Sequence, residues 1–132
     1  MKNIAAAFAA FFLLYSFAAM GKAPVEGAAT GESLYRTYCQ SCHGEAAKGD
    51  GPVAMYLVLP AADLTQIAIR RNGIFPEKDI YRIIDGRTEV RVHGTSDMPV
   101  WGDAFRREAS PEKTTEYIQK LVVYLKTVQE KE

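Results

Sequence analysis

The sequence predicts a small, mostly α-helical domain in which a few helices are joined by long loops. Three segments have apolar residues at helical spacing, with start or stop signals at their ends. No pair of alternating apolar runs suggests a β-hairpin, and no internal repeat is visible. The length of 132 residues, with 48% hydrophobic and 24% charged residues, fits one globular domain.

The N-terminus has the pattern of a secretory signal peptide. A short positive start is followed by an uncharged apolar run over 4–20 and then by small residues. We predict a signal peptide over 1–23 and a linker over 24–29, which leaves 30–132 as the folded domain. An uncleaved membrane anchor is the alternative, because the run has 17 residues and a span needs about 20. In both cases the domain is exported or periplasmic, and it is membrane-bound only if the segment is retained.

The charge balance argues against nucleic acid as a partner. Lys and Arg total 16, and Asp and Glu also total 16. A nucleic-acid-binding protein would show a basic excess or a basic stripe. We therefore predict no binding to nucleic acid.

The first predicted helix begins at Thr30, which is placed to act as its N-cap. Two tyrosines and the cysteines Cys39 and Cys42 then recur at spacings of three and four, so they share one helix face. Gly44 is placed to end the helix. This helix therefore leads directly into the cysteine pair.

The middle of the chain is predicted to contain one helix between loops. Residues 45–60 begin as a glycine-rich loop and end in a short apolar segment, and 61–65 is a turn. A helix follows between Pro76 and Gly86, which suit its first residue and its C-terminal stop. Residues 87–103 have turn formers and no helical period, so we predict an ordered loop there.

The last helix has the clearest signals. Ser110 is the predicted N-cap, Pro111 the first residue, and Glu112 complements the positive helix end. Long loops between so few helices are unusual in a compact domain and commonly have a binding role. A large apolar prosthetic group would supply the core that these loops lack. The apolar stripe of the last helix consists of Tyr117, Ile118, Leu121, Val122, Tyr124 and Leu125.

Both cysteines of the chain lie beside a histidine in the stretch "YCQSCHG". A redox-active dithiol would lie at the start of a helix after a strand, whereas this pair lies at the end of a helix. A structural zinc site needs four ligands. Adjacent Cys42 and His43 are poorly placed to share one tetrahedral ion. The full zinc set would be Cys39, Cys42, His43 and His93.

The C-x-x-C-H spacing is instead the attachment signature of c-type haem. On one helical turn, Cys39 and Cys42 would form thioethers with the two vinyl groups, and His43 would bind the iron. The predicted export agrees with this, because c-type haem is attached outside the cytoplasm. A disulfide between the two cysteines would be strained within a helix. We predict one covalent haem c with its iron.

The segments "GESLYRTYCQSCHGEAAKGDGPVA" and "DMPVWG" resemble those of small class I cytochromes c, over roughly residues 30–128. The resemblance implies an all-α cytochrome c fold, with a few helices and long loops wrapped around one covalently bound haem. In this family a glycine and an aromatic residue four positions apart make the crossing of the N- and C-terminal helices, and Gly31 and Tyr35 match them. Their expected partners are Tyr117, Leu121 and Tyr124.

The second axial ligand has three candidates. Met98 stands alone in a polar loop with no helical stripe to join, and the family resemblance places the thioether ligand in this loop. Met55 lies in an apolar segment, where we expect it to fill the core at the haem edge. His93 would give bis-histidine ligation, but a loop histidine hydrogen-bonded near the haem edge is the preferred interpretation. We predict Met98 as the distal iron ligand and His43 as the proximal one.

Four further residues are candidates for contacts around the haem. Pro52 matches the family proline whose carbonyl accepts the other N–H of the proximal histidine, which orients the ring and raises its basicity. Trp101 would either donate its indole N–H to a haem propionate or belong to the core. Arg70 and Arg71 could pair with the propionates, although a solvated charged surface is the commoner explanation.

Two protein ligands on the iron would favour one-electron transfer over chemistry on a bound substrate. Methionine ligation would also raise the reduction potential relative to a second imidazole. We predict an exported monohaem carrier of single electrons (Fe²⁺/Fe³⁺) and no enzyme, with redox proteins as partners at small transient interfaces. One alternative is the haem-bearing subunit of a larger dehydrogenase or reductase complex. Another, of a different class, is a haem ligand sensor or peroxidase with an open distal site.

Overall fold

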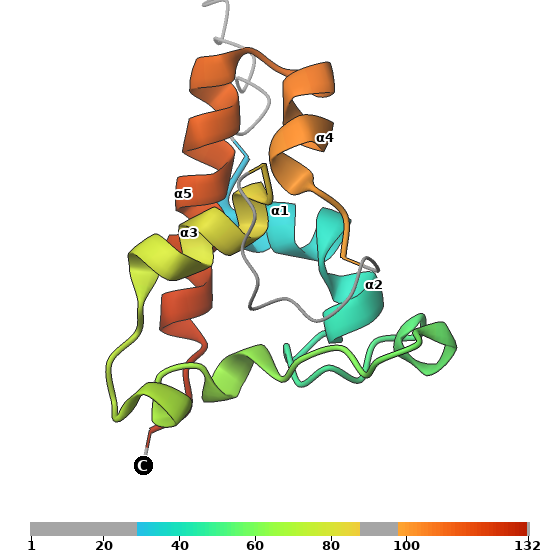
Figure 1. Cartoon of the computed structure of the whole chain (residues 1–132), viewed down its shortest axis with the longest axis vertical. Helices are drawn as coiled ribbons and strands as arrows, with labels where there is room; N and C mark the ends of the chain where they lie inside the picture. Colours follow the sequence, from blue (N-terminus) through green and yellow to red (C-terminus); the bar gives the residue numbers. More distant parts are fainter. Residues whose placement is uncertain (1–28, 88–97, 132) are drawn as a thin grey trace, which may run out of the picture.

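The computed structural model describes residues 29–87 and 98–131, so the predicted signal peptide lies outside the described part (Figure 1). Within these ranges the chain is helical and has no strand, which confirms the prediction of a mostly helical domain. The α-helices are α1 (Gly31–Tyr38), α2 (Gln40–His43), α3 (Glu77–Asp85), α4 (Trp101–Glu108) and α5 (Pro111–Thr127). The 3-10 helices are η1 (Ala54–Tyr56), η2 (Leu64–Gln66) and η3 (Ile69–Arg71).

Helix α1 begins with a reciprocal capping box. The Ser33 N–H donates to Thr30 Oγ1 over 3.1 Å, and the Thr30 N–H donates to Ser33 Oγ over 2.9 Å. The predicted single helix is interrupted at Cys39, whose φ of −115° departs from helical values. The His43 N–H still donates to Cys39 O over 2.9 Å, so α2 continues α1 after a local break.

The ends of α3 and α5 follow their sequence signals. Ser110 Oγ accepts from the Lys113 N–H, and Pro111 is the first residue of α5, as predicted. Helix α3 ends as predicted at Gly86, whose φ of 64° suits glycine. At its start Pro76 is the N-cap and not the predicted first helical residue, so the helix begins one residue later, at Glu77.

The predicted loop over 87–103 is wrong at its end, because α4 begins at Trp101. The N-cap Val100 makes no side-chain hydrogen bond and Gly102 is a poor helix former, so the usual start signals are missing. Tertiary packing holds the helix, since Phe105 is fully buried and the Trp101 ring stacks on it at 5.8 Å. The sequence signal for this helix is that Trp101 and Phe105 are four positions apart, which places them on the same helix face.

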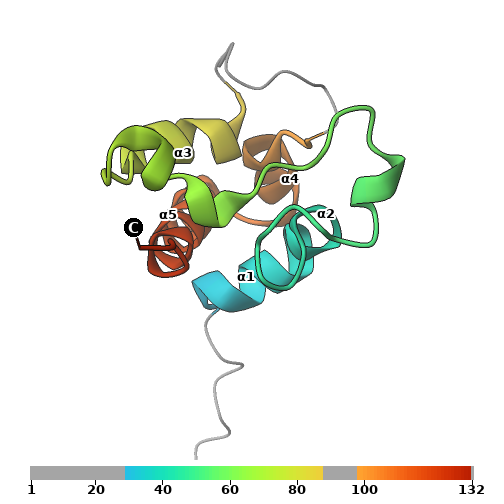
Figure 2. The same ribbon diagram turned by 90° about the horizontal axis from the view of Figure 1, so that it is seen from below.

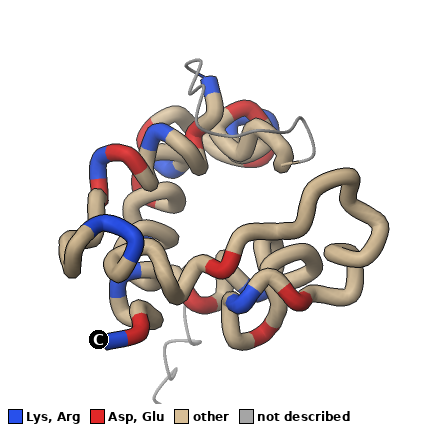
Figure 3. Tube along the Cα trace, turned by 60° about the horizontal axis from the view of Figure 1, so that its bottom comes forward, with Lys and Arg blue, Asp and Glu red and all other residues tan. Residues whose placement is uncertain are grey.

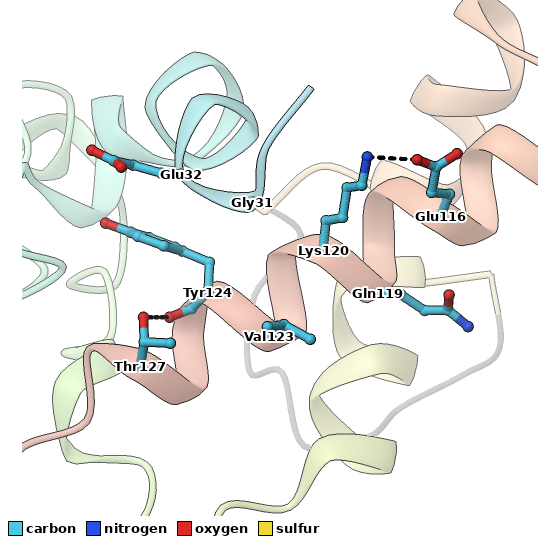
Figure 4. A pocket seen from close by; sticks show the side chains of 8 residues that line it. All are labelled: Gly31, Glu32, Glu116, Gln119, Lys120, Val123, Tyr124 and Thr127. Carbon is cyan, nitrogen blue, oxygen red and sulfur yellow. Dashed lines mark hydrogen bonds and ion pairs between the residues drawn. The ribbon is translucent and has the colours of Figure 1, made fainter. Parts of the chain in front are cut away.

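Helices α1 and α5 cross in close contact at Gly31. A Cβ at this position would lie 2.2 Å from Lys120 O and 2.8 Å from Tyr124 Cβ. Figure 4 shows Gly31 against the part of α5 from which Lys120 and Tyr124 extend. The rings of Tyr35 and Tyr124 pack beside the crossing with centroids 5.2 Å apart. The predicted role of Gly31 and Tyr35 in this crossing is confirmed.

Helix α5 is the centre of the core, with α1 on one side and α3 on the other (Figure 2). Ile118 and Leu121 of α5 are fully buried, as is Phe105 of α4. Burial of such side chains contributes about 1.5–3 kcal/mol each to folding. In the part of the chain that the structure describes, no helix is both long and apolar enough to cross a membrane.

Residues 129 and 130 join the end of α5 to the η2 segment. The Gln129 side chain accepts from the Ala68 N–H and donates to Leu64 O, both over 2.8 Å. The Glu130 N–H donates to Thr65 O over 2.9 Å. These bonds connect residues 61 to 65 positions apart, so they hold the middle of the chain against the end of its C-terminal helix.

Candidate functional site

The predicted attachment residues lie on one helical turn. Cys39 joins α1 to α2, Cys42 and His43 lie within α2, and all three are half-buried. Gly44 ends the turn with a φ of 82°, a conformation that favours glycine. The local sequence therefore places two thiols and one imidazole together.

A glycine-rich loop folds under the end of α2 and satisfies its carbonyl groups, which have no partner within the helix. A Cβ at Gly51 would lie 2.4 Å from Ser41 O, so this approach requires glycine. The loop thereby holds the end of α2 in place. Three backbone N–H groups of the loop donate hydrogen bonds to α2: Gly49 to His43 O (2.8 Å), Gly51 to Cys42 O (3.1 Å) and Val53 to Ser41 O (2.9 Å).

The imidazole of His43 is oriented by a backbone carbonyl, because His43 Nδ1 lies 2.9 Å from Ala62 O. A carbonyl only accepts, so Nδ1 carries the proton and Nε2 keeps a lone pair for a metal. Burial lowers the pKa of His43, which also favours the neutral ring. The acceptor in the structure is Ala62 and not the Pro52 carbonyl that the family resemblance implied. Pro52 itself is exposed.

The segment that contains Ala62 is held in place by its own hydrogen bonds. The Leu64 N–H donates to Ala47 O over 2.8 Å, and Asp63 Oδ1 accepts from the Thr65 N–H over 2.8 Å. Sequence reasoning missed the role of Ala62 because a backbone carbonyl leaves no side-chain signature. The only signal was that an ordered turn follows the glycine-rich loop.

The two arginines considered for the propionates have partners on the protein. Arg70 Nη2 donates to Asp63 O over 2.7 Å, and Arg71 lies 3.9 Å from Asp79. Both are exposed, as a solvated charged surface would be. Pairing with propionates stays a prediction.

The cysteines do not have the environment of a reactive dithiol. Both are free, and burial together with the charge of Cys42 raises the pKa of Cys39 to about 12. Reactive cysteines have a lowered pKa, so this environment argues against redox chemistry at sulfur. Within residues 29–87 and 98–131, no three His, Cys, Asp or Glu side chains gather as a metal site. His93, needed for the zinc alternative and for bis-histidine ligation, lies outside these ranges.

The predicted distal ligand lies near the start of α4. Met98 is half-buried and precedes Trp101 by three residues. The half-buried Trp101 ring packs edge-on against Tyr38, with centroids 5.4 Å apart, and Tyr38 directly precedes Cys39. The α4 start and the attachment turn are thereby brought together. A propionate bond from Trp101 and iron ligation by Met98 stay predictions.

An uncharged loop next to the attachment turn exposes apolar side chains. Residues 51–62 contain no charged residue, and Figure 3 shows them as part of a continuous tan loop projecting from the body. Met55 is 79% exposed, so its predicted packing at a haem edge also stays a prediction. Contiguous exposed apolar surface is typical of ligand-binding and interaction sites. The exposed members are Val53, Met55, Tyr56, Val58 and Leu59.

The residues present fit a c-type haem. The two thiols lie one helical turn apart, the imidazole has its Nε2 free for iron, and an uncharged apolar loop lies beside them. This prosthetic group requires two thiols for attachment, a nitrogen ligand for its iron and apolar side chains against its ring.

Replacing Tyr35 with phenylalanine should loosen the attachment turn. The Tyr35 hydroxyl is buried and donates to Gly44 O over 2.7 Å, directly after His43. We expect a loss of about 1 kcal/mol in the free energy of unfolding, since Gly44 O keeps a second bond from the Ala47 N–H. Urea unfolding followed by circular dichroism measures this loss.

Tyr38→Phe on the same helix is the matched control, because its hydroxyl bonds to Glu108 in an exposed position. We expect a change within about 0.5 kcal/mol for this variant. Equal losses in the two variants would contradict a special role for the Tyr35 hydroxyl.

Comparison with known proteins gives one result. A protein-family model described as cytochrome C oxidase, cbb3-type, subunit III matches residues 26–125, which is most of the chain. No curated protein and no solved structure gave a match.

Proposed function

Because the chain belongs to the family of cytochrome c oxidase, cbb3-type, subunit III, a monohaem class I cytochrome c family with covalent haem c, we propose that it carries single electrons between redox proteins. This family has the cytochrome c fold and is usually found outside the cytoplasm. Export of this chain, by the N-terminal segment predicted above, is part of the proposal.

The protein's contribution in this proposal is to hold the haem in one geometry. Cys39 and Cys42 would each hold the haem as a thioether, formed by addition of S–H across one vinyl group, so no oxidant would be consumed. His43 Nε2 and Met98 Sδ would bind its iron. When bound, the haem iron supplies reversible one-electron exchange between Fe²⁺ and Fe³⁺. With both of these side chains bound, the protein would exclude substrates from the metal.

The orientation of His43 is the observation that carries this proposal. Its Nδ1 bond to Ala62 O leaves Nε2 as the free ligand atom on the same turn as both thiols. A carbonyl oxygen that accepts the other ring N–H in this way fixes the ring and raises its basicity as a ligand. A freely rotating or protonated imidazole would not hold iron through both oxidation states.

A second candidate function is that of a haem-bearing subunit in a larger oxidoreductase. The observation that favours it is the family's description, which names a subunit of an oxidase. The same ligands would serve, and electrons would pass to a neighbouring subunit. Size-exclusion chromatography of the native protein separates the two: a carrier elutes as a small free protein, and a subunit elutes with a complex.

The holoprotein should behave as a six-coordinate one-electron carrier. We expect one covalent haem per chain, a reversible redox titration that fits one electron, and poor binding of carbon monoxide to the reduced protein. Spectroelectrochemistry and a carbon monoxide titration measure these properties. Ready binding of carbon monoxide would contradict the proposal and support a ligand sensor or peroxidase with an open distal site.

A further inference from the structure

We propose that Asp85 is a positioning residue that fixes the segment carrying Met98, acting through Gly102 in the first turn of α4. The inference rests on the proposed function, in which Met98 is the distal ligand, and adds how this ligand is held in place.

Asp85 is a covered carboxylate with one close charged partner. It is the last residue of α3, its side chain is 13% exposed, and its Oδ1 lies 2.6 Å from Arg87 Nε. The Arg87 side chain is 30% exposed, so this ion pair is more buried than an ordinary surface ion pair. Removing Arg87 leaves a partly buried and unpaired carboxylate at Asp85, which is costly, whereas removing Asp85 leaves Arg87 with the weaker attraction of Asp103 in the first turn of α4.

The first turn of α4 packs directly on this ion pair. A Cβ at Gly102 would lie 2.0 Å from Asp85 Oδ1 and 2.7 Å from Arg87 Nε, so only a glycine backbone fits here. The N-cap of α4, Val100, makes no side-chain hydrogen bond. A carboxylate beside this uncapped, positive helix end stabilises it. Asp85 therefore adds a negative charge to that of Asp103 at this end of α4.

Met98 is joined to this turn by a short, stiff link. Only Pro99 separates Met98 from Val100, and proline fixes its own φ and restricts the residue before it to extended conformations. Val100 in turn lies against the end of α3, since a Cβ at Gly86 would be 3.3 Å from Val100 Cα. The backbone of Met98 cannot shift far unless the first turn of α4 shifts with it.

The same turn is held from its other side by α1. The Trp101 ring packs on Tyr38, the residue before the first attachment cysteine, with centroids 5.4 Å apart. The start of α4 is thus clamped between α3, through Asp85, and α1, through Tyr38. Loosening the Asp85 contact removes one of the supports that set where Met98 lies relative to the attachment turn.

The test uses imidazole as a small ligand that competes with Met98 in the oxidised holoprotein. In Asp85→Asn the shape is kept and the charge is lost, so we expect imidazole to bind about tenfold more tightly than in wild type, which corresponds to about 1.4 kcal/mol. The weak red-edge absorption band of sulfur-bound iron should also disappear at a lower urea concentration. The matched control is Asp79→Asn, on the same helix, whose side chain is 38% exposed and pairs with exposed arginines.

Variants of Arg87 test the same ion pair from its other side, so the conclusion does not depend on Asp85→Asn alone. Arg87→Gln should raise imidazole affinity as Asp85→Asn does, and Arg87→Lys should restore it to near the wild-type value. A purely structural role would lower the urea midpoint of global unfolding and leave imidazole affinity unchanged. If Asp85→Asn does not fold, the comparison of Arg87→Gln with Arg87→Lys decides the question.

The failures of the two proposals are distinguishable. If the band is present in all variants and Asp85→Asn binds imidazole no better than Asp79→Asn, the role of Asp85 is overturned and the proposed function stands. If the wild-type protein lacks the band, the assignment of Met98 is overturned, and the role of Asp85 is overturned with it.

Discussion

Replacing Met98 with alanine is expected to abolish the red-edge absorption band of the oxidised holoprotein and open the distal side to small ligands. The thioether is the only sulfur ligand proposed for the iron, so its removal leaves no source for this band. We expect carbon monoxide to bind the reduced variant at least roughly a hundredfold more tightly, or about 2.7 kcal/mol. The reduction potential should fall, because a methionine ligand raises it. Absorption spectra, a carbon monoxide titration and a redox titration measure these changes.

Met55→Ala is the matched control for this variant. Met55 lies in η1 and its side chain is 79% exposed, so its loss should leave the band in place. A band that survives in Met98→Ala, or one that disappears in Met55→Ala, would contradict the assignment. His93→Ala extends the test, since only a bis-histidine protein would change its spectrum in that variant.

Replacing Gly31 with alanine is expected to destabilise the whole domain. The new Cβ would meet Lys120 O at 2.2 Å and Tyr124 Cβ at 2.8 Å, and a backbone carbonyl cannot rotate away. Alanine is normally the better helix former by about 1 kcal/mol, so propensity alone predicts the opposite sign. We expect a loss of about 3 kcal/mol, at the upper end for overpacking, and a fall in Tm on the order of 10–20 °C. Thermal unfolding of the holoprotein measures the change.

Gly73→Ala separates this clash from backbone strain. Gly73 has a φ of 81° and nothing within 4 Å of a Cβ, so alanine there meets strain without a clash. We expect a cost of about 1–2 kcal/mol for that variant. If Gly31→Ala is as stable as wild type, the close contact between α1 and α5 is not the determinant of stability that the structure indicates.

The helix ends and the attachment turn were predictable because their signals are local. Thr30, Ser110 and Gly86 act within a few residues of their own positions, through caps and a left-handed turn. The spacing of Cys39, Cys42 and His43 is likewise a property of one helical turn. Such features depend little on the rest of the chain.

The parts that could not be predicted depend on contacts between distant segments. Helix α4 has no good start signal of its own and is held by the packing of Trp101 and Phe105 and by the contact of Gly102 with Asp85. The Ala62 carbonyl is 19 residues from the ring that it orients. Neither a backbone acceptor nor a glycine contact has a side chain that a sequence pattern can reveal.

The bonds of Gln129 and Glu130 to the η2 segment have a consequence for biosynthesis. This segment follows directly on Ala62, and its hydrogen bonds to the C-terminus form only after residues 129 and 130 have been made. A ribosome adds about 5–20 residues per second. The 87 positions between Cys42 and Gln129 therefore take roughly 4–17 s to translate. During that time both thiols are already present, while the segment beside the His43 ring still lacks its bonds to the C-terminus.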